Sequence, residues 1–244
     1  MARAEFRYPR RRLMRSCVRK ATQALFAVLT EFNIEGAANF PVAGPLLVVA
    51  NHFSFIDPVA LVRITPWPLE FLGGFRTPNA PPVISWLREL WGYYPVFRGT
   101  GAQLAFRAAD AILGQDGVLG VFPEGTSNVA VLRPARLGVA VIAVRAGARI
   151  LPVGLDGFTE VFPKLAQGRR ARVTARVGTP FGPFSAPGRG RARRKLLEEI
   201  GHEMMRRIAE LIPPRRRGYY SDDPQLRAAA QEVAFYPFDA EPEG

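Results

Sequence analysis

The stretch PLLVVANHFSFIDPVAL (residues 45–61) joins two expected elements of regular structure through a polar turn. Its apolar run at 45–50 is rich in Leu and Val and predicts a fully buried strand. Asp57-Pro58 is typical of a helix start, with Asp as the N-cap and Pro in the first turn. Between them lies His52, one of two histidines in the chain. Histidine transfers protons near neutral pH, so the turn is either a reaction site or a surface turn that happens to contain His and Asp.

The rest of the chain continues this alternation of short apolar runs and amphipathic segments. Runs typical of strands lie at 69–74, 93–98, 118–125 (a strand that ends in a loop), 149–158 and 171–181, and patterns typical of helices lie at 58–64, 83–92, 101–117, 135–147 and 190–212. Such alternation predicts an α/β fold with a mostly parallel sheet flanked by helices. Sites in these sheets form at the carboxyl ends of strands. We therefore expect His52, Arg98 and Glu124, each just past a predicted strand, to share one site.

The chain divides into three expected regions: a basic amphipathic helix within residues 1–32, the main domain at 33–212, and an acidic, loosely ordered tail at 213–244. The helical pattern spans residues 11–32. Its apolar positions are Leu13, Cys17, Ala21, Ala24, Leu25, Val28 and Phe32. The apolar run falls short of the roughly 20 residues that a bilayer span needs. The helix is expected to lie in a membrane interface, to pack on the protein's own core, or to do both.

The net charge of +12 is distributed unevenly. Residues 1–20 carry +7, residues 21–163 carry −1, residues 164–217 carry +11 and residues 218–244 carry −5. A nearly neutral centre between basic flanks suits a reaction core beside an anionic surface, either a membrane or a nucleic acid. The sequence has no zinc-finger or RNP-type signature, so a membrane with anionic lipid is the expected partner and nucleic acid is not.

Cysteine and histidine are scarce in this chain. A single cysteine, Cys17, excludes an intramolecular disulfide. With only two histidines besides, a metal site built from Cys or His is not expected, and we expect no bound cofactor. The simplest location is cytoplasmic, on the inner face of the cell membrane and bound peripherally or monotopically.

The segment VFPEGTSN (121–128) places Glu124 and Gly125 in a loop after a predicted strand. A carboxylate there lies next to a glycine, which lets a ligand approach the backbone closely. A surface turn is the alternative for Glu124 taken alone.

Together these residues resemble the glycerolipid acyltransferase family, whose best-known members are 1-acyl-glycerol-3-phosphate acyltransferases. The family motifs N-H-x4-D, a glycine-to-arginine block, F-P-E-G-T and an apolar strand with proline are matched, in family order, by Asn51, His52 and Asp57, by GYYPVFRG with Arg98, by residues 122–126, and by ILPVGL with Pro152. The resemblance covers roughly residues 33–212 and implies that this region is an acyltransferase domain.

The resemblance implies transfer of a fatty acyl group from acyl-CoA or acyl-carrier protein, as co-substrate, to the sn-2 hydroxyl of 1-acyl-glycerol-3-phosphate, which gives phosphatidic acid. His52 is expected to act as general base, and Asp57 to fix its tautomer and stabilise the imidazolium. The expected substrate-binding residues are Asn51, Arg98, Glu124, Gly125, Thr126 and Arg136. The arginines are expected to hold the acceptor phosphate.

One departure from the family pattern concerns the acceptor. Ser127 stands where the family usually has an arginine that is thought to hold the phosphate. Arg133 and Arg136 are candidates to supply the missing charge, with solvated surface arginines as the alternative. The alternative acceptor is therefore another lysophospholipid or a different molecule with a hydroxyl group.

Two alternatives to this mechanism are open. The first is covalent catalysis with Ser54 as nucleophile, because Ser54 lies between His52 and Asp57. The G-x-S-x-G turn typical of such a serine is absent from the sequence. A non-enzymatic basic module that binds lipid or nucleic acid is the alternative of a different class. His202 lies in a charged helical segment and is expected to be structural or solvated.

Overall fold

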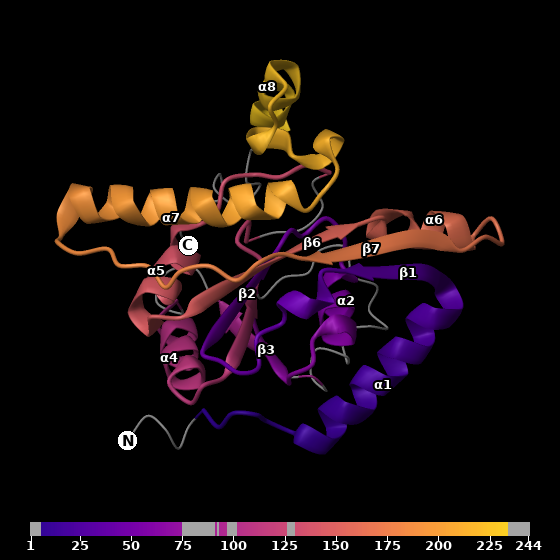
Figure 1. Ribbon diagram of the computed structural model, residues 1–244, viewed down its shortest axis with the longest axis horizontal. Helices are drawn as coiled ribbons and strands as arrows, with labels where there is room; N and C mark the ends of the chain where they lie inside the picture. The colour runs from indigo at the N-terminus through magenta and orange to yellow at the C-terminus, as the bar shows by residue number, and fades with distance from the viewer. Residues whose placement is uncertain (1–5, 75–90, 92, 97–101, 126–129, 234–244) are drawn as a thin grey trace, which may run out of the picture.

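The computed structural model describes residues 6–74, 91, 93–96, 102–125 and 130–233. Figure 1 shows a sheet with helices on both faces. Its seven strands lie in the order β1-β7-β6-β2-β5-β3-β4. The strands are β1 (Thr30–Glu35), β2 (Leu46–Ala50), β3 (Leu69–Gly74), β4 (Tyr93–Val96), β5 (Val118–Val121), β6 (Arg149–Asp156) and β7 (Ala171–Val177).

The sheet is mostly parallel, as the sequence predicted. Strands β2 to β6 run in one direction, whereas β7 pairs antiparallel with β6 and parallel with β1. Strand β2 lies between β5 and β6, and all five of its residues are buried. The carboxyl ends of β2, β5 and β6 therefore meet at one edge of the sheet.

Helices cover both faces of the sheet. They are α1 (Arg12–Leu29), α2 (Asp57–Ile64), α4 (Ala102–Leu113), α5 (Leu137–Ala146), α6 (Val161–Leu165), α7 (Gly190–Glu210) and α8 (Pro224–Val233). Leu47 and Val49 of β2 pack in one core with α4, α5 and α7. Leu46, Val48 and Ala50 point the other way and pack in a second core with α1 and α2.

The amphipathic helix α1 packs on the protein by its polar side. Arg15, Thr22 and Phe26 are buried, whereas the predicted apolar stripe from Leu13 to Val28 is exposed to solvent. Arg15 donates to the buried Glu70 at 2.8 Å and to the backbone carbonyls of Leu69 and Trp91. A buried ion pair, with two further hydrogen bonds from Arg15 to backbone carbonyls, thus fixes the helix, and the apolar residues of α1 face solvent.

Several expected boundaries differ in the structure. The helix expected at 101–117 is α4, which ends at Leu113, the helix expected at 135–147 is α5 (Leu137–Ala146), and the strand expected at 149–158 ends at Asp156. Helix α1 ends at Leu29, and residues 30–35 form β1 beside β7, so Phe32 lies in a strand. The expected strand at 171–181 ends at Val177. Residues 213–244 were expected to be a loosely ordered tail, but two 3-10 turns (Pro214–Arg216 and Gly218–Tyr220) and helix α8 lie within 214–233.

The described part of this C-terminal region is held by contacts with earlier parts of the chain. Tyr219 N–H donates to the Leu132 carbonyl at 3.1 Å, and Ser221 and Ala230 are buried. His202 Nδ1 lies 2.8 Å from the Tyr220 hydroxyl, so His202 joins α7 to this region, which agrees with the structural role expected for it. The expected helix at 83–92 lies outside the described residues except for residue 91.

Within the described ranges, the structure contains no helix long and apolar enough to cross a membrane.

Candidate active site

The end of β2 is fixed to the neighbouring strand β6 by Asn51. Its side-chain amide donates to the Leu155 carbonyl at 2.8 Å, and its side-chain carbonyl accepts from the Leu155 N–H at 2.7 Å. The side chain is fully buried. Because both its polar atoms are used by the backbone, Asn51 positions the loop, in place of the substrate contact that was expected of it.

His52 follows directly and faces Asp57, the first residue of α2. His52 Nδ1 lies 3.1 Å from Asp57 Oδ2. The imidazole is partly exposed, at 16%, whereas the Asp57 side chain is 1% exposed. Since Nδ1 is directed at the carboxylate, Nε2 is the ring nitrogen that an incoming group meets. A buried acid that orients an imidazole in this way is the arrangement a general base requires.

Asp57 holds the turn before α2, although it does not cap the helix as expected. Helix α2 begins at Asp57 itself, with Ile56 at the N-cap position. The carboxylate instead accepts from the Ser54 N–H, at 2.7 Å, in addition to its contact with His52. Burial raises the pKa of Asp57 above its ordinary range, and the hydrogen bonds from His52 and Ser54 partly offset this rise.

Glu124 lies under the same loop. It follows β5, the neighbour of β2 in the sheet, and its Oε1 accepts from the His52 backbone N–H at 3.0 Å. Its Oε2 accepts from the Arg133 N–H at 3.3 Å and lies 3.7 Å from the Arg133 guanidinium. The side chain is fully buried. The surface-turn alternative for Glu124 is therefore wrong, and His52 and Glu124 lie together, as expected of two members of the predicted site.

The pKa of Glu124 is raised to about 7. Burial is the main cause, and the charge of Asp57 adds to the rise. The N–H donors of His52 and Arg133, together with the Arg133 charge, act in the opposite direction. Near neutral pH this carboxyl group is thus divided between its protonated and ionised forms.

Gly125 and Arg136 lie next to each other at the rim of the site. Gly125 has φ +73°, and a Cβ placed on it would approach Arg136 Cγ to 3.1 Å. The Arg136 N–H donates to the Pro123 carbonyl at 2.8 Å, just before α5 begins at Leu137. Glycine meets both demands of this turn, a left-handed backbone and close approach of another side chain.

Phe122 adds an aromatic wall to His52. The two rings stack with centroids 4.1 Å apart and planes 20° apart. Phe122 also packs over Phe71 of β3. The stacking limits rotation of the imidazole, so Phe122 is a positioning residue whose role the sequence analysis did not assign.

The remaining sequence candidates divide into three groups. Arg98, Thr126 and Ser127 lie outside the described residues. Arg133 is 1% exposed and contacts Glu124, so the alternative that Arg133 is a solvated surface arginine is wrong. Ser54 is buried, and its Oγ accepts from the Ile56 N–H at 3.5 Å, an arrangement that gives no support to a nucleophile. Among the described residues, no three His, Cys, Asp or Glu side chains gather as metal ligands would.

The fold and this site define an α/β protein with a carboxylate-oriented histidine at the carboxyl edge of a mostly parallel sheet. The chain belongs to the Acyltransferase family, whose model matches residues 31–156. That match spans Asn51 and His52 after β2, Glu124 after β5, and Leu155 in β6.

Named relatives agree with this assignment. The chain is 26% identical over 201 residues to sheep (Ovis aries) 1-acyl-sn-glycerol-3-phosphate acyltransferase alpha, a match that covers 76% of this chain and 65% of that protein. The human (Homo sapiens) protein of the same name is 27% identical over 141 residues, covering 54% of this chain and 47% of that protein. The chain thus spans less than two thirds of the length of these relatives.

A solved structure has the same fold. The crystal structure of the 1-acyl-sn-glycerophosphate (LPA) acyltransferase PlsC from Thermotoga maritima matches with a TM-score of 0.55 and 26% identity, covering 78% of this chain and 77% of that chain.

Proposed function

We propose that this protein is an O-acyltransferase that moves a fatty acyl group from a thioester donor, acyl-CoA or acyl-carrier protein, to the sn-2 hydroxyl of 1-acyl-glycerol-3-phosphate. The observation that carries the proposal is the 3.1 Å contact between His52 Nδ1 and the buried carboxylate of Asp57. The activities for which the sheep, human and Thermotoga relatives are named support the substrate class.

In the proposed reaction His52 acts through Nε2. The acceptor hydroxyl gives its proton to Nε2 as its oxygen attacks the thioester carbonyl. The tetrahedral intermediate then expels the thiolate, which takes the proton back from the imidazolium, so His52 ends as it began. Asp57 stabilises the imidazolium between the two steps. Because the substrate's own hydroxyl attacks, no acyl-enzyme forms.

We assign recognition of the acceptor headgroup to the rim of the site. Arg136 lies beside Gly125 on the loop that carries Glu124, and guanidinium groups form paired hydrogen bonds with phosphate. Arg98 and Thr126 are proposed to take part from the sequence motifs alone. Because Ser127 replaces the usual arginine, an acceptor without a terminal phosphate is the second candidate.

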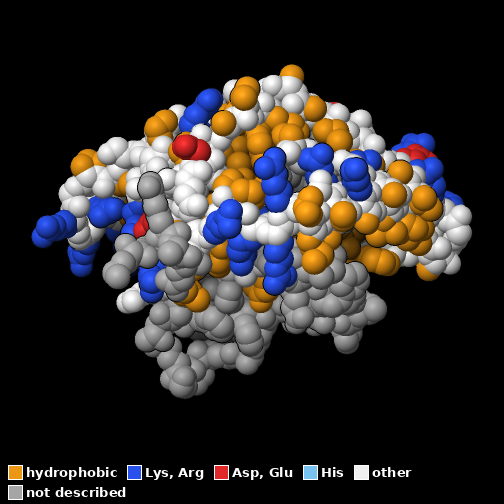
Figure 2. Space-filling model, turned by 90° about the horizontal axis from the view of Figure 1, so that it is seen from below, with side chains coloured by type: hydrophobic (Ala, Val, Ile, Leu, Met, Phe, Trp, Pro, Cys, Tyr) orange, Lys and Arg blue, Asp and Glu red, His pale blue; other side chains and the backbone are white. Residues whose placement is uncertain are grey.

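We further propose that the protein works at the cytoplasmic face of the membrane with α1 against the lipid. Leu13, Leu25 and Val28 are 85%, 53% and 71% exposed on its outer side. Figure 2 shows hydrophobic side chains gathered on this face, with Lys and Arg side chains beside them. Apolar side chains flanked by cations are what an interfacial helix presents to anionic lipid.

A basic cavity next to this helix supports the same orientation. Arg7, Arg10, Arg11 and Arg12, with Pro9, line a surface cavity of about 510 Å³ at the start of α1. Each basic side chain near an anionic membrane contributes about 1 kcal/mol to binding. The non-enzymatic alternative, a lipid-binding module, shares this surface but leaves the His52–Asp57 pair without a role.

The test is a panel of acceptors with one labelled acyl-CoA and anionic vesicles. Lysophosphatidate is compared with lysolipids of the same chain length whose phosphate is esterified to a further group. We expect transfer to be fastest to lysophosphatidate. Preference for the esterified lysolipids would overturn the acceptor assignment, and absence of transfer to every hydroxyl acceptor would overturn the enzymatic proposal.

A further inference from the structure

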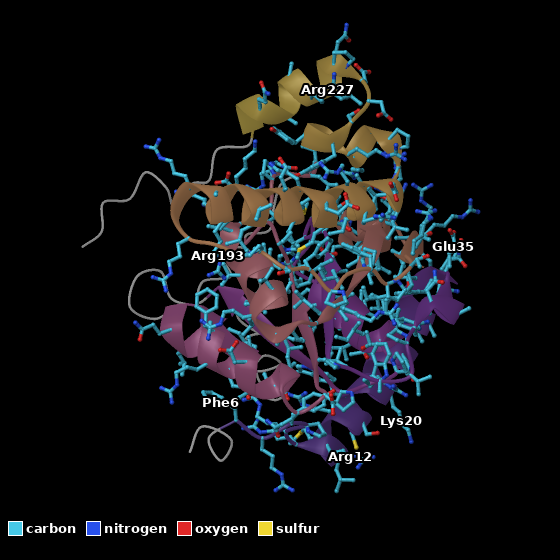
Figure 3. All side chains as sticks on the ribbon, turned by 60° about the vertical axis from the view of Figure 1, so that its left-hand side comes forward. Phe6, Arg12, Lys20, Glu35, Arg193 and Arg227 are labelled. Carbon is cyan, nitrogen blue, oxygen red and sulfur yellow. The ribbon has the colours of Figure 1, made fainter. Side chains whose placement is uncertain are left out.

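Helices α5 and α7 enclose a groove of about 450 Å³ on the face of the sheet opposite α1. Its lining consists of Leu137, Val141, Arg145, Gly190, Arg193, Arg194 and Leu197. Its apolar surface comes mainly from Leu137 and Val141 of α5, with the buried Leu197 of α7 beside them, and the arginines stand at its margins. Figure 3 places Arg193 below α7, toward α5.

The basic margin extends beyond the lining. The first turns of α7 also carry Arg191 and Lys195, which are exposed. Two of the marginal arginines pair at the surface, Arg145 with Asp110 and Arg194 with Glu198. Exposed pairs of this kind contribute little and exchange readily for another carboxylate. The surface is therefore an apolar stripe with an excess of positive charge along its edge.

The groove begins at the candidate active site. Leu137 is the first residue of α5 and directly follows Arg136, which contacts the loop of Gly125. An α-helix of ten residues is about 15 Å long, so the groove leads away from the site along α5. A molecule bound in it lies next to the loop that holds Glu124 and His52.

The position of the groove places it away from the proposed membrane surface. Helix α1 belongs to the core on one face of the sheet, whereas α5 and α7 belong to the core on the other. In Figure 1, α7 lies at the upper left, below α8, and α1 lies at the lower right. When α1 rests on lipid, the α5–α7 groove faces the aqueous side.

We propose that this groove docks an acidic amphipathic helix of a carrier protein that bears the acyl thioester. The apolar stripe takes the apolar face of that helix, and the arginines pair with the carboxylates beside it. Docking there presents the protein-bound donor at the edge of the active site. The inference rests on the proposed acyl transfer, because it assigns the form of the donor.

Binding of the donor protein itself is the first test. A fluorescently labelled, palmitoyl-loaded acidic acyl carrier protein is titrated with the full chain, and fluorescence anisotropy gives the Kd. The test variant is R193E/R194E. The matched control is R206E/R207E, which reverses two adjacent arginines at the other end of the same helix, where both pair with Glu203. Circular dichroism confirms that each variant is folded.

We expect R193E/R194E to raise the Kd at least tenfold and R206E/R207E to change it less than threefold. Equal weakening of carrier-protein binding by both variants indicates non-specific electrostatic attraction and overturns the proposal. An unchanged Kd for R193E/R194E, or no binding by the wild type, also overturns it. The binding assay needs no turnover, so its outcome is independent of the proposed chemistry.

Transfer kinetics provide the second test. With palmitoyl-carrier protein as donor, R193E/R194E is expected to raise KM at least tenfold, whereas with palmitoyl-CoA its KM stays within twofold of the wild type. Equal loss with both donors would mean that the groove holds a part common to both and would contradict protein docking. No transfer by the wild type from either donor would reject the proposed function instead.

Discussion

The backbone N–H of His52 donates to Glu124 Oε1 at 3.0 Å, so the carboxylate of one sequence motif holds the backbone of another. These residues are 72 positions apart and meet because β2 and β5 are neighbours in the sheet. Glu124 is fully buried under the loop and is a positioning residue. We propose that it acts on the reaction through the backbone of His52, which it holds in place.

Stability should depend on pH through Glu124. Its pKa is about 7 in the folded chain against an ordinary 4.5. Between these values the folded state binds a proton that the unfolded state has released, so wild-type stability falls as pH rises. E124Q lacks this titration. Relative to E124Q, the free energy of unfolding of the wild type is expected to fall by about 3 kcal/mol between pH 4.5 and 7, measured by urea unfolding.

The control is E160Q, at an exposed site. If the free energy of unfolding of the wild type and of E124Q depends on pH in the same way, the assignment to Glu124 is wrong.

Asn51→Ala should destabilise the protein and slow turnover. The substitution leaves the N–H and carbonyl of Leu155 buried without partners, at about 1–3 kcal/mol for each group. We expect the free energy of unfolding to fall by about 2–4 kcal/mol and kcat to fall more than KM changes. Asn33→Ala, at an exposed site on β1, is the control and is expected to stay within about 0.5 kcal/mol. If N51A is as stable as the wild type and only its KM is raised, Asn51 contacts the substrate and the positioning role is wrong.

Glu70→Gln should loosen the attachment of α1. Glu70 is fully buried and accepts from Arg15 at 2.8 Å, and Arg10 pairs with it at 2.7 Å. Removing one partner of a buried ion pair costs about 3–5 kcal/mol. The exposed pair of Arg172 and Glu31 supplies the control E31Q, expected to cost at most about 1 kcal/mol. Similar effects of both substitutions on urea unfolding would mean that the buried pair has no special role.

Binding to anionic vesicles should depend on the outer side of α1. We expect L13Q/L25Q/V28Q to lower the vesicle partition coefficient at least about tenfold, because three exposed apolar side chains no longer enter lipid. The change should leave folding intact, since none of the three side chains is buried. Leu196→Gln, an exposed leucine on α7, is the control and should bind like the wild type. Equal partitioning of all three proteins in a sedimentation assay would contradict the proposed orientation.

The sequence predicted the central sheet well because β2 is an uninterrupted apolar run with polar residues directly after it. Strands of this kind are buried on both faces, and the ends of parallel strands meet. The sequence therefore predicts that His52 and Glu124 lie close together. The antiparallel pairing of β7 with β6 was not predicted, because pairing direction leaves no mark in a short alternating strand.

Other features depend on partners distant in the chain. The spacing of α1 identified its apolar side, but not that the opposite side would be buried, because this requires Glu70, which is 55 residues from Arg15. The two hydrogen bonds of Asn51 likewise depend on Leu155, 104 residues away. Local pattern predicts elements, whereas such polar pairings follow only from the assembled sheet.

The central claim is that His52 is the general base and that Asp57 orients it. The most direct measurement is kcat for transfer from labelled palmitoyl-CoA to lysophosphatidate by H52A, with vesicle binding measured on the same preparation. We predict that kcat falls by about 10²–10⁴-fold, the range supplied by a positioned base, while vesicle binding is unchanged. Transfer by a folded H52A at the wild-type rate would contradict the account.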